Sequence, residues 1–155
     1  MTLSVDILLD RAIQERVATA LETQPAEVGA GGYTVTYIFV AEDFGDGWTE
    51  DIQSPAGLRG KVMAISLYDV TEQFVGTTSA GPVHVGIQGG DADAYAISEG
   101  ITQTLNTDVP ETLSVKEGVV GTIPAGDDIL VTGVQNVGGT PAGICSVAVT
   151  IKYFV

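Results

Sequence analysis

Apolar and polar side chains alternate with a period of two along most of the chain that follows Gly32. Successive side chains of an extended strand point to opposite faces of a sheet, so this pattern predicts strands with one buried face. The clearest case is the final segment, residues 144–155. One of its faces comprises Cys145, Val147, Val149, Ile151, Tyr153 and Val155. The opposite face comprises Ser146, Ala148, Thr150 and Lys152, and only Phe154 interrupts that series.

Five earlier segments also have a strand pattern, with glycines and prolines between them. They are residues 33–42, 60–70, 82–87, 111–120 and 127–135. Segment 60–70 is apolar on both faces, which is typical of a central strand, and residues 72–77 can continue it past a bend. Residues 94–101 fit a helical turn or a strand. Seven or eight short strands predict an all-β fold, mainly an antiparallel β-sandwich of jelly-roll-like form.

The amino-terminal residues follow a different period. Their apolar positions recur at four-residue spacing: Leu9, Ile13, Val17 and Leu21. This stripe predicts an amphipathic helix from Asp6 to Thr23, with Asp6 as its cap and Pro25 preventing its continuation. The alternative is a short strand through Leu3, Val5 and Ile7. We expect residues 1–28 to be a helix or arm that packs on, or extends from, a β-sandwich domain of residues 29–155.

Charged side chains are sparse and unevenly distributed. They make up 17% of the 155 residues, and none occurs in residues 129–151 or 73–90. Both stretches contain Thr, Gln, Gly and Pro and alternate with period two, so neither fits an apolar membrane helix. We expect sheets that are buried on one face and covered on the other by a neighbouring molecule.

The net charge of −14 restricts the partners of the protein. Nucleic acid and anionic membrane are disfavoured, because binding to phosphate needs clustered Lys and Arg. A basic protein surface or a metal ion is compatible with the charge, and so is a simple role in solubility. The amino terminus has neither a basic region nor a long apolar run, so no signal peptide is expected.

Residues for enzyme chemistry are scarce. His84 is the only histidine, and the strand pattern places it on the face opposite Val83 and Val85. Cys145 is the only cysteine and falls on the predicted core face, where a small buried side chain is more usual than a nucleophile. No nucleotide-binding glycine motif is present. We expect a non-enzymatic protein without a cofactor, although nothing in the sequence excludes a glycosidase-like pair of carboxylates.

The most unusual stretch is the acidic loop "AEDFGDGWTEDI", residues 41–52. The candidate partner-contact residues in it are Asp43, Phe44, Asp46, Trp48, Glu50 and Asp51. Tryptophan is a frequent anchor of interfaces and can also serve as a platform for a sugar ring. The clustered carboxylates also suit Ca²⁺, although the spacing does not match an EF-hand. The remaining interpretation is a solvated loop whose aromatic side chains fold back onto the sheet.

The carboxyl-terminal quarter resembles the closing strands of β-sandwich proteins on tailed-phage virions. The matching parts are the "IPAG" turn (residues 123–126), the Gly/Thr/Pro loop that follows the next strand, and the final alternating strand. The proteins that show this pattern are capsid decoration, or cement, proteins and the related head-fibre proteins. The resemblance implies a non-enzymatic protein that binds the outside of a capsid, often as a trimer.

The leading hypothesis is therefore a capsid decoration protein that stabilises a phage capsid by bridging subunits of the major capsid protein. It would be made in the host cytoplasm, form a homo-oligomer such as a trimer, and reside on the virion surface. The alternative is a β-sandwich module that binds glycans or a host surface through Trp48 and the acidic loop. A hydrolase is the third possibility.

Overall fold

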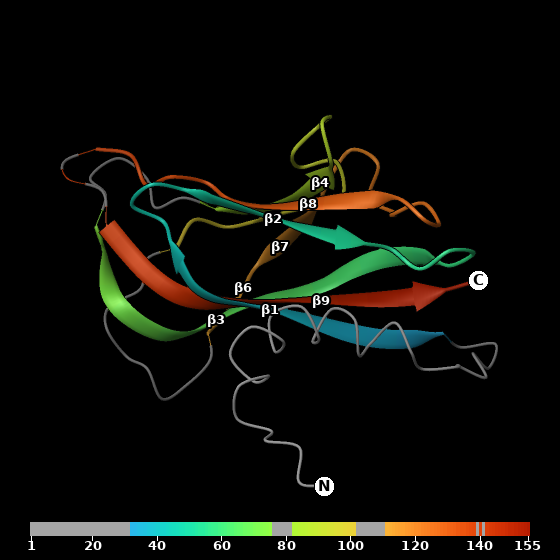
Figure 1. Cartoon of the computed structure of the whole chain (residues 1–155), viewed down its shortest axis with the longest axis horizontal. Coiled ribbons are helices and arrows are strands. Elements are labelled where there is room, and N and C mark those ends of the chain that lie inside the picture. Colours follow the sequence, from blue (N-terminus) through green and yellow to red (C-terminus); the bar gives the residue numbers. More distant parts are fainter. Residues whose placement is uncertain (1–31, 76–81, 102–110, 139, 141) are drawn as a thin grey trace, which may run out of the picture.

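The computed structural model of the chain describes residues 32–75, 82–101, 111–138, 140 and 142–155. These residues form two antiparallel sheets that face one another as a β-sandwich (Figure 1). No helix occurs within these ranges. The predicted amino-terminal helix or arm, and the short strand that is its alternative, lie outside the described residues.

Within the described ranges, nine strands make up the sandwich. They are β1 (Tyr33–Asp43), β2 (Trp48–Gln53), β3 (Arg59–Val75), β4 (Val83–Ile87), β5 (Ala96–Ser98), β6 (Glu111–Leu113), β7 (Val115–Glu117), β8 (Asp128–Gly133) and β9 (Ala142–Phe154). The first sheet, which we call sheet A, has the order β1-β9-β3-β6. The second, sheet B, has the order β2-β8-β4-β5-β7.

The strand pairs are nested along the sequence. β1 pairs with β9, β2 with β8, β3 with β6, and β4 with β5. The chain therefore doubles back on itself like one long hairpin that is folded over two sheets. The additional strand β7 pairs with β5 at the edge of sheet B.

β9 is the central strand of sheet A and lies between β1 and β3 (Figure 1). Its inward positions are fully buried, as the alternation predicts: Cys145, Val147, Val149, Ile151 and Tyr153. Val155 departs from the prediction, because it follows the end of the strand and is 85% exposed. The inward face of β1 meets the same core, and the Tyr37 and Tyr153 hydroxyl oxygens are 2.9 Å apart.

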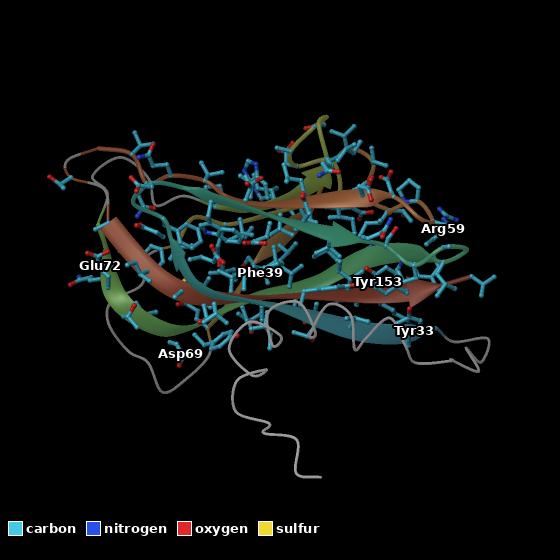
Figure 2. All side chains as sticks on the ribbon, in the orientation of Figure 1. Tyr33, Phe39, Arg59, Asp69, Glu72 and Tyr153 are labelled. Atoms are coloured by element: carbon cyan, nitrogen blue, oxygen red, sulfur yellow. The ribbon has the colours of Figure 1, made fainter. Side chains whose placement is uncertain are left out.

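β3 is the longest strand and carries the molecule's strongest irregularities. Its register with β9 shifts after Val62, after Tyr68 and again after Glu72. Asp69 adopts a positive φ of 49°, where the strand bends. Figure 2 shows Asp69 and Glu72 at this bend, and Arg59 at the opposite end of the sandwich. β3 continues past this bend to Val75, which confirms the predicted continuation of the strand for residues 72–75.

Most predicted strands are confirmed, and two predictions need correction. Residues 111–120 are not one strand, because the chain changes sheets at Ser114: β6 pairs in sheet A and β7 in sheet B. The acidic stretch of residues 41–52 is not a continuous loop, because β2 begins at Trp48. The ambiguous residues 94–101 contain the short strand β5.

Replacement of Ile151 by alanine measures how much a side chain of β9 contributes to the stability of the core. The side chain is fully buried between the two sheets, so Ile151→Ala should lower the free energy of unfolding by about 2 to 5 kcal/mol. Lys152→Ala is the matched control, because the neighbouring side chain is exposed and its removal should cost less than about 0.5 kcal/mol. Urea unfolding followed by Trp48 fluorescence measures both. Equal losses in the two variants would contradict the assigned faces of β9.

Candidate interaction surfaces

The predicted contact residues surround the turn between β1 and β2. Asp43 ends β1, Phe44 and Asp46 belong to the turn, and the other three lie at the start of β2. The Gly45 N–H donates a hydrogen bond of 2.7 Å to Asp43 Oδ1, which is the local pattern of an Asx turn. Gly47 has a φ of 78°, a conformation that glycine adopts without steric cost.

Hydrogen bonds to residues that are distant in the sequence also hold this turn in place. The Phe44 N–H donates to the Gly143 carbonyl at 2.7 Å, and the Asn136 N–H donates to the Phe44 carbonyl at 3.0 Å. Gln135 Nε2 donates to the Gly45 carbonyl at 2.6 Å. Since these partners are distant in the sequence, the turn is part of the folded framework and not an independent loop.

The two aromatic residues of the turn pack internally. Phe44 is fully buried, and its ring centroid lies 5.6 Å from that of Trp48, edge to face, and 5.2 Å from that of Phe74. Trp48 is partly buried and also packs on Phe39, which points between the two sheets (Figure 2). The indole is therefore occupied by contacts within the protein, and the exposed members of the six candidate contact residues are the acids Asp46, Glu50 and Asp51.

These acids do not assemble a recognisable metal site. Within the described residues, no group of three or more His, Cys, Asp or Glu side chains is arranged to hold a metal ion. The contact of this turn with a partner remains a prediction, and its accessible part consists of carboxylates.

Glu42 and Glu50 face each other across the edge of the sandwich, where β1 and β2 meet. Glu42 follows an irregularity in the pairing of β1 with β9, and the preceding Ala41 has a positive φ of 58°. Burial, and then the nearby negative charge of Glu50, raise the pKa of Glu42 to about 7. The carboxyl group at this edge therefore changes its charge near neutral pH.

The histidine and the cysteine lie in different parts of the sandwich. His84 is in β4 with its neighbours Val83 and Val85 buried, so its predicted outward position is confirmed. Cys145 is buried in the core face of sheet A, and burial, with a smaller contribution from Glu42, raises the pKa of its thiol to about 12. A thiol with that pKa is protonated at neutral pH and is a poor nucleophile. The two side chains do not form a Cys-His pair.

One unexplained feature accompanies His84. It pairs in register with Thr132 of β8, so the two side chains are neighbours on the outward face of sheet B. His84 Nε2 and Thr132 Oγ1 are both buried, and neither has a hydrogen-bond partner among the described residues. This pair could not be predicted from the sequence, because it depends on which strands lie side by side.

The outward face of sheet A is the second candidate surface, and we call it the neutral face. Its members are Thr36, Ile38, Val40, Ala64, Ser66, Thr112, Ala148 and Thr150, as the strand registers place them. The hydroxyl oxygens of Thr36 and Thr150 are 3.0 Å apart, and those of Ser66 and Thr112 are 3.1 Å apart, which places each pair on one side of the sheet. Ile38 and Val40 are 47% and 57% exposed. None of these members is acidic, whereas Asp43 and Glu72 are each paired in register with Ile144 at one end of the same sheet face.

Basic residues mark one end of the neutral face. Lys61 and Lys152 are paired in register across β3 and β9, at the end where β1 begins. Lys61 Nζ lies 3.3 Å from Glu117 Oε2, in an ion pair whose side chains are both about half exposed. Such an exposed pair contributes little to stability. The outward face of sheet B, by contrast, carries Asp51 and Asp128.

Replacement of Gly133 by alanine should displace Trp48. The two residues are paired in register, and a methyl group at position 133 would overlap the indole ring. The Gly133→Ala variant should therefore lose about 1 to 3 kcal/mol of stability and shift the emission of the single tryptophan to longer wavelength. Thr132→Ala, one position away on the opposite face, is the control and should leave the emission unchanged. An unshifted spectrum in Gly133→Ala would show that the indole does not pack on this strand.

Replacement of Glu42 by glutamine should change how stability depends on pH. Because the folded protein raises the pKa of Glu42 from 4.5 to about 7, the contribution of this group is fully present below about pH 4.5 and is lost as the pH rises through 7. Glu42→Gln should therefore melt at a higher temperature than the parent protein at pH 8 and at nearly the same temperature at pH 5. Thermal melts at the two pH values measure this difference.

The control for that experiment is Asp46→Asn, which removes an exposed carboxylate from the same turn. It makes the same change in net charge without removing a carboxylate at the Glu42–Glu50 contact. A difference between Glu42→Gln and the parent that is the same at both pH values would contradict the raised pKa.

Comparisons with known proteins find one distant structural similarity and no similarity in sequence. No family model matches the chain, and no curated protein matches it. Among solved structures, a chain of the "Cyanophage Pam1 capsid asymmetric unit" aligns with a TM-score of 0.40 and 20% identity, over 86% of this chain and 92% of that one. A likeness this distant carries no argument about fold or function. In the part of the chain that the structure describes, no helix is long and apolar enough to cross a membrane.

Proposed function

We propose that this protein is a non-enzymatic structural component of a phage virion. In this role it is a decoration protein that binds the outside of the capsid and stabilises it by bridging subunits of the major capsid protein. It acts as a homo-oligomer, a trimer in the first instance, and needs no cofactor. Nucleic acid and membrane are not among its partners, since the chain carries a net charge of −14.

The neutral face is the observation that carries this proposal. A protein with so large a negative charge repels copies of itself and other acidic surfaces through most of its exterior. The named residues of the neutral face include no acid and expose Ile38 and Val40, so this part of sheet A can be buried against another protein without leaving a carboxylate unpaired. Exposed apolar groups that cluster on one face of a protein are typical of an interaction site.

The nested strand order supports the same role. We infer that the sandwich is a jelly roll, in which β7 is an addition to the eight strands that pair as β1-β9, β2-β8, β3-β6 and β4-β5. Jelly rolls are two-sheet folds that occur in viral capsid proteins, lectins and cupins. The fold is therefore compatible with a virion protein and with a sugar-binding module. The two roles have to be distinguished by the side chains that the surface presents.

The disposition of Trp48 favours the virion role over the glycan-binding alternative. A sugar platform presents an aromatic face to solvent, whereas the Trp48 ring packs on Phe39 and Phe44. His84 and Cys145 lie on different sheets, and this separation favours a non-enzymatic protein over a hydrolase that would use them.

Co-sedimentation with capsids tests the proposal. The full-length protein should pellet with capsids built from the major capsid protein of the same phage. Ile38→Asp should weaken this binding by about tenfold or more, because it places a charge in the neutral face. Gln53→Asp, an exposed outward position of sheet B, is the matched control and should bind as the parent does. Light scattering of the free protein measures the oligomeric state.

Two outcomes would contradict the virion role. One is a protein that stays in the supernatant at every capsid concentration. The other is a monomer that binds defined sugars on a glycan array and loses this binding when Trp48 is replaced by alanine without unfolding.

A further inference from the structure

We propose that the free protein associates in pairs, in which the neutral faces of two copies meet face to face about a two-fold axis. The partner is a second copy of this chain, turned so that the positively charged end of one sheet face lies over the negatively charged end of the other. The proposal concerns the free protein in solution and does not rest on the virion role.

The first argument is the separation of charge along the outward face of sheet A. At one end, which we call the basic end, lie three of the four basic side chains of the described residues: Arg59, Lys61 and Lys152. Lys61 is paired in register with Lys152, and Arg59 is paired with Phe154 in the next outward row. Lys61 forms the ion pair with Glu117, whereas Lys152 is exposed and has no ion pair within the described ranges. The basic end therefore keeps a positive charge.

The other end of the same face, the acidic end, carries carboxylates. Asp43 of β1 and Glu72 of β3 are each paired in register with Ile144 of β9. Asp69 lies with Glu72 at the bend of β3 (Figure 2). Glu72 Oε2 accepts a hydrogen bond of 3.3 Å from the Gly143 N–H, and in the part of the chain that the structure describes no base lies at this end. The acidic end therefore keeps its negative charge.

The two charged ends are placed symmetrically about the middle of the neutral face. Along β9, Ile144 and Lys152 are about 26 Å apart, at about 3.3 Å per residue. Ala148 lies midway between them and is in register with Ile38 of β1 and Ser66 of β3. The row through these three residues is therefore the centre of the face.

A two-fold axis parallel to this central row makes the face complementary to itself. The rotation lays each strand of sheet A over the same strand of the second copy, in the opposite direction. Lys152 of one copy then lies over Ile144 of the other, between Asp43 and Glu72, and the same contact recurs at the opposite end. Stacked sheets are about 10 Å apart, a distance that facing Lys and Glu side chains can bridge. Such complementary charges fix the orientation of two partners.

The second argument is the apolar surface at the centre of the contact. Ile38 and Val40 are 47% and 57% exposed on the outward side of β1. In the pair, Ile38 lies over Ile38 of the second copy, and Val40 lies over Thr36. Burial of exposed apolar side chains favours association.

The hydroxyl groups of the neutral face do not oppose this burial. The hydroxyl oxygens of Thr36 and Thr150 are within hydrogen-bond distance of each other, and so are those of Ser66 and Thr112. Because these groups are paired within sheet A, a second copy can cover them without leaving them unsatisfied.

The size of the contact indicates a reversible pair. Strands β1, β9 and β3 together are about 14 Å wide, at about 4.8 Å per strand, and the charged ends are about 26 Å apart. An interface of this extent is at the low end for specific complexes. The pair would therefore cover the exposed apolar residues of the free protein and would open when another protein competes for the face.

The outward face of sheet B lacks this arrangement. It carries the acids Asp51 and Asp128, and its base, Lys116, lies on the edge strand β7. A side chain at Gly86 would overlap the carbonyl oxygen of Asp91, so a loop covers part of this face. Of the two outward faces, only that of sheet A combines an uncovered centre with opposite charges at its two ends.

Analytical ultracentrifugation of the full-length protein over a range of concentrations tests the proposal. The average mass of the parent protein should rise with concentration to twice the mass of one chain and no further. Lys152→Glu and Glu72→Lys should each weaken the association by about tenfold or more, because each brings like charges together at both ends of the contact. Both side chains are exposed, and thermal melts show that the variants are folded.

A mixture of the two variants provides the sharper measurement. The first variant retains Glu72 and the second retains Lys152, so every end contact of a mixed pair joins opposite charges. The mixture should associate about as strongly as the parent protein, although neither variant does so alone. Within one chain the two positions lie at opposite ends of the sheet, far beyond the screening length of about 8 Å, so only a contact between chains restores the association.

Three further variants locate the contact. Lys116→Glu and Asp128→Lys make the same changes of charge on the outward face of sheet B, and both should associate as the parent does. Ile38→Asp should prevent the pair, because it places two carboxylates against each other at the axis.

Four outcomes would overturn the proposal. The first is the mass of a single chain at every concentration, and the second is a trimer, since a two-fold contact closes at two copies. The third is an equal effect of the same charge changes on sheets A and B. The fourth is a mixture that associates no better than its two components. Capsid binding plays no part in these measurements, so the pair and the virion role can fail independently.

Discussion

The pairing of β9 with both β1 and β3 is the constraint on which the rest of the sandwich depends. β9 supplies five fully buried inward side chains, and its two neighbours supply the remainder of that face of the core. Because β1 and β9 come from the two ends of the described chain, sheet A cannot form until most of the chain is in place. Such non-local pairing makes folding slow but leaves a cooperative product, in which a change on β9 is felt by both sheets.

Sheet A thereby acquires two faces with opposite properties. Its inward face is closed by aliphatic and aromatic side chains, with Tyr153 in contact with Tyr33 and Tyr37. Its outward face carries hydroxyl-bearing and apolar side chains at the centre, Lys61 and Lys152 at one end, and Asp43 and Glu72 at the other. Because residues 144–151 contain no charged side chain, the central part of this outward face is neutral.

The sequence predicted the parts of the fold that depend on local alternation. The inward rows of β1 and β9 could be read from periodicity alone, and so could the outward position of His84. It could not predict the division at Ser114, because the switch between sheets depends on the partners Ile65 and Ala96, which lie elsewhere in the chain. The candidate contact turn was found through its acids. The burial of Phe44 agrees with the interpretation that the aromatic side chains fold back onto the sheet, and the sequence could not select that interpretation because the packing depends on Phe74 and Gly143.

The charge of this strongly acidic chain is unevenly distributed over the two sheets. Screening in physiological salt weakens interactions between exposed charges beyond about 8 Å. On sheet A, Asp43 and Glu72 are each paired in register with Ile144, at the end away from Lys61 and Lys152. Acids on the outward face of sheet B would instead lie within the contact itself. The neutral face is therefore the part of sheet A where the negative charge of the protein opposes a contact least.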